Sequence, residues 1–230
     1  MINRLSLFLL LCLTACASPH PTPTPIEVTS VLSIRYLALG DSYTIGESIA
    51  VMDRWPNRLA RSLEEQGIPT DVTIIAKTGW TTSELWDGIQ EQKPEPPYDL
   101  VSLLIGVNNQ YRGYDINQYR EQFVFLLNKS IEYAGGDADR VIVLSIPDWG
   151  VMPFAHGRNT TQIANDIDAF NAVNRAETEK ANAHYVDITP TSRDAMNDHA
   201  LIAPDGLHPS GRMYAEWVKQ ALPEVLKALR

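Results

Sequence analysis

The order of apolar segments constrains the fold of this chain more than any other feature. From residue 33 onward, short continuous apolar runs alternate with longer segments whose apolar residues recur every three or four positions. Short continuous runs are typical of strands covered on both faces, and the three-to-four spacing is typical of amphipathic helices. The alternation therefore predicts a parallel sheet with helices on both faces. The predicted strands are 34–39, 72–76, 100–105, 141–146 and 184–187, and the predicted helices are 55–66, 83–92, 117–134, 163–183 and 211–228.

Local signals refine this pattern. Thr81 and Glu84 have the spacing of a capping box, which predicts the start of a helix directly after Thr81. In open parallel sheets, chemistry takes place in the loops beyond the carboxyl ends of the strands. We therefore expect functional residues in the loops that follow Leu39, Ala76, Ile105 and Ile146.

The first residues have the form of an export signal. Arg4 precedes the apolar run 5–13, which is too short for a permanent membrane helix. The sequence Leu-Thr-Ala-Cys at 13–16 resembles the bacterial lipobox, in which the cysteine receives a lipid. We predict a lipoprotein signal peptide over 1–15 and lipidation of Cys16. The alternative is an ordinary signal peptide with an incidental cysteine.

Three parts of the chain follow from this interpretation. Residues 16–32 form a tether rich in proline and threonine, and 33–230 form one domain. Ala17 stands where an aspartate would indicate retention in the inner membrane, so we expect anchoring to the outer membrane, facing the periplasm. The net charge of −9 argues against nucleic acid as a partner. The oligomeric state cannot be predicted from the sequence.

A serine follows the first predicted strand in the triplet Gly40-Asp41-Ser42. A serine hydroxyl is a poor nucleophile unless a base removes its proton. By itself the triplet is typical of a turn. Thr44 stands where the Gly-x-Ser-x-Gly motif requires its second glycine, which argues against the common α/β-hydrolase elbow.

A candidate base lies near the end of the chain, in the sequence Pro-Asp-Gly-Leu-His-Pro at 204–209. A histidine can serve a serine nucleophile if an acid orients its ring and stabilises its cation. Asp205 precedes His208 by three residues across a predicted tight turn, so its carboxylate can accept a hydrogen bond from the ring. The other histidines, His20, His156, His184 and His199, lack a comparable acid partner.

Hydrolysis of an ester also requires hydrogen-bond donors for the developing oxyanion. The loop at 106–109 (Gly-Val-Asn-Asn) offers the side-chain amide of Asn108. The loop at 77–80 (Lys-Thr-Gly-Trp) offers the backbone N–H of Gly79, with no side chain in the way. Each loop follows a predicted strand, so both loops lie at the same edge of the sheet.

These four loops together resemble the SGNH subgroup of the GDSL esterases and lipases. The family's first block matches at Gly40, Asp41 and Ser42, its second at Gly79, its third at Gly106 and Asn108, and its last at Asp205 and His208. The resemblance extends over nearly the whole domain, from about residue 36 to about residue 214. The third block departs from the family pattern, because Asn109 replaces the usual aspartate.

The resemblance implies a three-layer α/β/α flavodoxin-like fold with a five-stranded parallel sheet. It implies hydrolysis of acyl esters without a metal or another cofactor, with Ser42 as nucleophile, His208 as base and Asp205 as the partner of His208. It also implies an oxyanion hole formed by the backbone N–H groups of Ser42 and Gly79 and the side chain of Asn108. The alternative is a tethered protein that binds a ligand without turnover.

The substrate is less constrained than the reaction. A short-chain acyl ester, an acetylated glycan and a lysophospholipid all fit the sequence. Aromatic side chains in the predicted loops are candidate substrate contacts, although they can equally pack the loops onto the core. These candidates are Trp80, Tyr111, Trp149 and Phe154.

Overall fold

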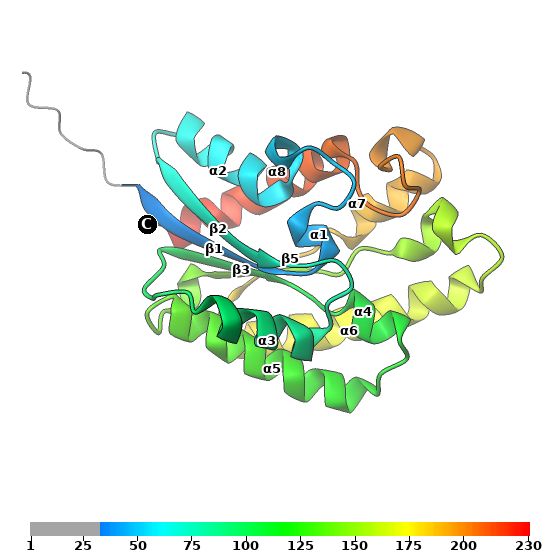
Figure 1. Ribbon diagram of the computed structural model, residues 1–230, viewed down its shortest axis with the longest axis horizontal. Helices are drawn as coiled ribbons and strands as arrows, with labels where there is room; N and C mark the ends of the chain where they lie inside the picture. Colours follow the sequence, from blue (N-terminus) through cyan, green and yellow to red (C-terminus); the bar gives the residue numbers. More distant parts are fainter. Residues whose placement is uncertain (1–32) are drawn as a thin grey trace, which may run out of the picture. The chain divides into compact units, whose positions relative to one another are not determined.

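The computed structural model describes residues 33–230, and its centre is a parallel sheet of five strands (Figure 1). The strands follow the order β2-β1-β3-β4-β5, which is the flavodoxin-like order. This architecture confirms the predicted fold class. The strands are β1 (Ile34–Gly40), β2 (Thr70–Ala76), β3 (Leu100–Leu104), β4 (Val141–Leu144) and β5 (His184–Val186).

The core of the sheet is formed by β1, β3 and β4. Their side chains are almost all buried, as expected for apolar runs covered on both faces. Leu37 of β1 pairs with Thr73 on one side and with Val101 on the other, so β1 lies between β2 and β3. The runs predicted as strands through Ile105 and Ile146 remain buried beyond the last paired residue, because there the chain leaves the sheet for the functional edge.

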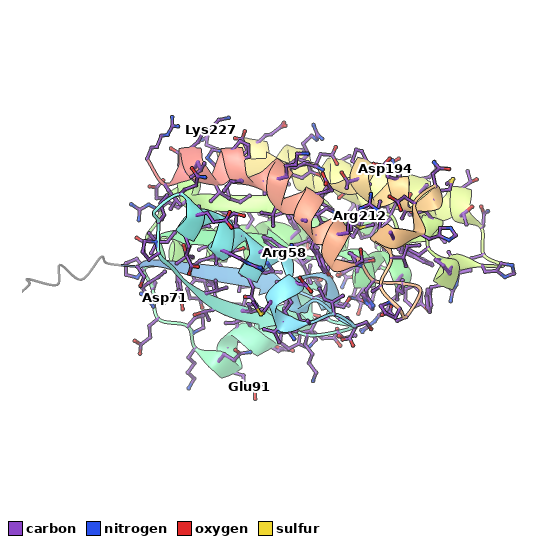
Figure 2. The ribbon with its side chains drawn as sticks, turned by 90° about the horizontal axis from the view of Figure 1, so that it is seen from above. Arg58, Asp71, Glu91, Asp194, Arg212 and Lys227 are labelled. Atoms are coloured by element: carbon purple, nitrogen blue, oxygen red, sulfur yellow. The ribbon has the colours of Figure 1, made fainter. Side chains whose placement is uncertain are left out.

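Five long helices cover the sheet. Figure 1 shows α2 and α8 on one face and α3, α5 and α6 on the other, which completes the three layers. Each helix lies close to its predicted range. The bounds are α2 (Trp55–Glu65), α3 (Thr82–Gln92), α5 (Ile116–Tyr133), α6 (Thr160–Lys180) and α8 (Gly211–Ala228). Figure 2 shows α8 running along the sheet, from Arg212 near its start to Lys227 near its end.

The predicted capping box is present at the start of α3. The backbone N–H of Thr81 donates to Glu84 Oε2 at 2.8 Å, and the Thr81 hydroxyl accepts from the backbone N–H of Glu84. Helix α6 begins earlier than predicted, because the side chain of Asn159 caps it by accepting the N–H of Gln162 at 3.0 Å. Polar caps, rather than the first apolar residue, therefore determine where these helices begin.

Short helices occupy segments between the predicted strands and the long helices. Two of them directly follow central strands, α1 after β1 and α4 after β3. The short α-helices are α1 (Ser42–Ile45), α4 (Val107–Tyr111) and α7 (Thr189–Arg193). The 3₁₀ helices are η1 (Val51–Asp53), η2 (Ala138–Arg140), η3 (Trp149–Val151), η4 (Pro153–Ala155), η5 (Asp194–Met196) and η6 (His199–Leu201).

The predicted signal peptide, the lipidation of Cys16 and the tether over 16–32 lie outside the described residues. Within residues 33–230, no helix combines the length and the apolar character needed to cross a bilayer.

Candidate active site

Helix α1 holds Ser42 at the carboxyl end of β1. Asp41 caps this short helix, since its Oδ1 accepts the backbone N–H of Tyr43 at 3.0 Å. The hydroxyl of Tyr214 on α8 donates to the backbone oxygen of Tyr43 at 2.9 Å. Because α1 is tied at both its cap and its second residue, Ser42 has a defined position at the first residue of the helix.

The turn at 205–208 joins an acid to a ring nitrogen. Asp205 Oδ2 lies 2.6 Å from His208 Nδ1, and its Oδ1 accepts the backbone N–H groups of Leu207 and His208, both at 2.9 Å. The Ser48 hydroxyl donates to the same Oδ2 at 2.6 Å. The carboxylate therefore fixes the imidazole through Nδ1 and leaves Nε2 for another partner.

The environment of Asp205 keeps its carboxylate ionised. Burial by itself raises the pKa of Asp205, but the hydrogen bonds from Ser48, His208 and Leu207 together lower this pKa well below its usual range. Hydrogen bonds to the charged oxygens outweigh the desolvation because the side chain retains 28% of its exposure. At neutral pH, Asp205 is thus a fixed negative charge beside the His208 ring.

Two cross-contacts join the loop after β2 to helix α4. The side-chain amide of Asn108 donates to the backbone oxygen of Trp80 at 2.9 Å. Arg112, which caps the end of α4, donates to the backbone oxygen of Gly79 at 2.6 Å. Gly79 has a φ of +85°, a conformation that favours glycine. These contacts hold the peptide of Gly79 and the side chain of Asn108 beside each other.

Asn109, the departure from the family pattern, has a structural role. Its side chain is fully buried, accepts the backbone N–H of Thr82 at 3.1 Å and donates to the Thr82 hydroxyl at 2.8 Å. Asn109 therefore holds the start of α3 against α4. Asn108, and not Asn109, lines the cavity at this edge of the sheet.

One cavity of about 170 Å³ brings most of the predicted site residues together. Asp205 lies behind this cavity, on the ring of His208. Trp80 does not line the cavity: its ring packs so closely on α3 that a Cβ on Gly88 would lie 2.1 Å from it. The lining consists of Ser42, Tyr43, Thr78, Gly79, Val107, Asn108, Tyr111, Trp149, Phe154, Leu207 and His208.

Comparison with known proteins identifies the family. Residues 38–216 match the profile of the GDSL-like Lipase/Acylhydrolase family. The chain belongs to this family. It is 26% identical over 227 residues to an arylesterase of Vibrio mimicus, a match that covers 96% of this chain and 98% of that protein. This GDSL-family protein is therefore a hydrolase of the esterase class.

Solved structures share its fold. TesA superposes with a TM-score of 0.67 at 18% identity and covers 85% of this chain and 99% of its own. Axe2, an acetylxylan esterase from Geobacillus stearothermophilus, superposes with a TM-score of 0.63 at 20% identity and covers 84% of this chain and 94% of its own. At these identities the likeness shows the fold alone.

Sequence reasoning about this GDSL-family hydrolase missed three residues that support the site. Ser48 contacts Asp205 from 157 positions away, and no motif marks such a contact. Gln110 accepts the indole N–H of the cavity residue Trp149 at 2.8 Å. Arg112 follows Asn108 by one helical turn, which is the only signal in the sequence that could have indicated it.

Within residues 33–230, no cluster of His, Cys, Asp and Glu could hold a metal ion.

Asp41 of this GDSL-family hydrolase should make stability depend on pH. Burial raises the pKa of its carboxyl to about 7, because the side chain is fully buried and its Oδ2 has no hydrogen-bond partner among the described residues. Between the ordinary pKa of 3.8 and about 7, the folded chain keeps a proton that the unfolded chain has lost. The free energy of unfolding therefore falls as the pH rises through this range.

The substitution Asp41→Asn removes this titration and preserves the oxygen that caps α1. Urea denaturation at pH 5 and pH 8 should show the wild type losing stability relative to the Asp41→Asn variant at the higher pH. A stability difference that is the same at both pH values would contradict the raised pKa.

Proposed function

We propose that this hydrolase cleaves carboxylic esters through a triad of Ser42, His208 and Asp205 and an acyl-enzyme intermediate. The observation that carries the proposal is the convergence of Ser42, Gly79, Asn108 and His208 on one cavity, with Asp205 hydrogen-bonded to His208 Nδ1 at 2.6 Å. These groups come from four separate segments of the chain. A nucleophile, a base, its orienting acid and oxyanion donors are the parts that acyl transfer needs.

In the first half of the reaction, Ser42 Oγ attacks the ester carbonyl while His208 Nε2 takes the proton of the hydroxyl. The carbonyl oxygen becomes an oxyanion, which accepts hydrogen bonds from the backbone N–H groups of Ser42 and Gly79 and from the amide of Asn108. His208 then gives the proton to the leaving alcohol, and the acyl group remains on Ser42. Asp205 stabilises the imidazolium that exists between these two proton transfers.

In the second half, His208 Nε2 takes a proton from water, and the resulting hydroxide attacks the acyl carbonyl. The same donors hold the second oxyanion. His208 returns the proton to Ser42 Oγ as the acid leaves, so the enzyme regains its starting state. Because one N–H of the Asn108 amide already contacts the Trp80 oxygen, the amide is oriented before substrate arrives.

The cavity favours small substrates. A volume of about 170 Å³ is close to that of a cavity that holds benzene, which is on the order of 150 Å³. An acetyl group with a small alcohol, or a phenyl ring, fits such a space, whereas a long acyl chain extends beyond it. We propose short-chain and aryl esters as substrates. The relative from Vibrio mimicus, an arylesterase, supports the aryl part of this proposal.

A fluorophosphonate probe and a graded series of esters test the proposal. We expect the probe to form one adduct, which mass spectrometry locates on Ser42. We also expect kcat/KM for p-nitrophenyl esters to be highest with acetate or butyrate and to fall as the chain lengthens. Absence of labelling, together with absence of hydrolysis, would instead support the alternative of a non-catalytic protein that binds a ligand on the same fold.

A further inference from the structure

Arg158 lies over three aromatic rings at the rim of the active-site cavity. Its Cζ is 5.3 Å from the ring centroid of Tyr111, 5.4 Å from that of Trp149 and 5.2 Å from that of Phe154. All three rings line the cavity. One Arg158 nitrogen, Nη2, donates to the Tyr111 hydroxyl at 3.2 Å. The guanidinium is thus held by ring faces rather than by a carboxylate.

The charge of Arg158 is available to a ligand. A guanidinium has five N–H donors, and in residues 33–230 the contact with Tyr111 is the one hydrogen bond that the Arg158 side chain makes. Arg158 has no ion pair with the described residues, whereas Arg112 pairs with Glu84, and Arg193 pairs with Asp148 and Asp168. On a chain of net charge −9, Arg158 is an exposed positive charge beside an apolar cavity, and no residue of 33–230 supplies a countercharge.

The segment that carries Trp149, Phe154 and Arg158 is tied to the turn of His208. The backbone N–H of Phe154 donates to the backbone oxygen of Gly206 at 3.0 Å, and Pro153 packs against Gly206. This segment, yellow-green in Figure 1, joins β4 to α6 at the edge where the strands end. In the proposed mechanism, His208 protonates the leaving alcohol. Trp149, Phe154 and Arg158 therefore lie on the side of the cavity where the alcohol part of an ester leaves. The ring of Tyr111 on α4 contacts both of the other rings and so lies on the same side.

We propose that Tyr111, Trp149, Phe154 and Arg158 form a subsite for the alcohol part of aryl esters that carry a carboxylate. The substrate ring packs against the three aromatic side chains, which contact each other at centroid distances of 5.4 to 6.3 Å. The carboxylate pairs with the planar guanidinium, whose geometry suits bidentate contact. This proposal rests on the proposed esterase function and adds the substrate class to it.

A double ratio of kcat/KM values tests the subsite. The two substrates are 4-acetoxybenzoate and 4-acetoxybenzamide, which have nearly the same shape and differ in charge. The ratio for the wild type is divided by the ratio for Arg158→Gln, so intrinsic reactivity cancels. We expect a double ratio of about three to five, as for a charged pair at an exposed site. A double ratio of about one would overturn the proposal.

Two further measurements keep the result independent of one variant. The wild-type ratio of kcat/KM for 4-acetoxybenzoate to kcat/KM for 4-acetoxybenzamide should fall between about 0.02 M and 0.5 M NaCl, because salt screens exposed charges. The variant Arg158→Lys keeps the charge without the planar fork, so it should retain an intermediate preference. A preference that responds neither to salt nor to either substitution would also contradict the subsite.

Matched controls separate this proposal from the esterase function. Arg140→Gln makes the same change of charge at the opposite edge of the sheet, where Arg140 precedes β4 and pairs with Asp99 and Asp137. This control should leave the ratio of the kcat/KM values for the two substrates unchanged. If the wild type hydrolyses both esters but shows no contribution from Arg158, the subsite is wrong and the esterase function stands. If it hydrolyses p-nitrophenyl acetate but neither of these two esters, the subsite is wrong, and if it hydrolyses none of the three, the proposed triad mechanism fails as well.

Discussion

The substitution Ser42→Ala is expected to lower kcat for p-nitrophenyl acetate by about 10⁴-fold or more. Without the Oγ, no acyl-enzyme can form. The remaining oxyanion donors and the bound geometry can then assist only a direct attack by water. The effect is the largest that we expect for any single side chain, because every step of the proposed mechanism uses this oxygen. The measurement is steady-state hydrolysis by the purified domain, corrected for the rate without enzyme.

The fold should tolerate this change. Ser42 is already buried with 5% exposure, and its small side chain makes no hydrogen bond with another residue of 33–230. A melting temperature near that of the wild type would confirm that the loss is chemical. Ser62→Ala, in α2, is a control that removes the hydroxyl of a residue that does not line the cavity. If Ser42→Ala hydrolysed the ester at nearly the parental rate, Ser42 would not be the nucleophile.

The second large effect is expected for Asp205→Asn, which should lower kcat by about 10³- to 10⁴-fold. The backbone N–H groups of Leu207 and His208 can still be accepted by the amide oxygen. The amide nitrogen then faces His208 Nδ1 and donates to it, so the ring proton moves to Nε2. That tautomer cannot take the proton of Ser42, and the imidazolium also loses its countercharge.

Ser48→Ala is the matched comparison for this prediction. Ser48 donates to the same Asp205 Oδ2 that contacts the His208 ring, so its loss weakens the positioning of the acid but leaves its charge. We expect only a several-fold decrease in kcat. In Ser48→Ala, the hydrogen bonds from His208 and Leu207 still hold the pKa of Asp205 low, so raising the assay pH should not restore this variant. If Asp205→Asn retained more than a tenth of the parental kcat, Asp205 would not be the partner of His208.

Local sequence signals predicted the elements of this fold well. The spacing of apolar residues located the long helices and the strands to within a few residues, and the pair Thr81 and Glu84 marked the start of α3. These signals succeed because hydrogen bonds within a helix and caps involve residues that are close in the chain. They missed α1 and α4, which are too short to show a period and which depend on Asp41 and Gly106 at their starts.

The tertiary structure decided which side chains share the cavity. Trp80, predicted as a substrate contact, packs on Gly88 because the chain turns its ring toward α3. Arg158 and Ser48 carried no motif, yet one lies over the aromatic rings and the other contacts Asp205. The sequence gives the type of such residues, but it does not show in which direction their side chains point.

The sequence by itself determined the class of fold, the four blocks of the family and the pairing of Asp205 with His208 across a short turn. These four blocks lie far apart in the chain, and only folding brings them together. The parallel order of the strands places every functional loop at one edge of the sheet, and contacts between Asn108, Arg112 and the loop of Gly79 set the geometry there. The cavity, and therefore the choice of ester, depends on contacts between residues distant in the chain.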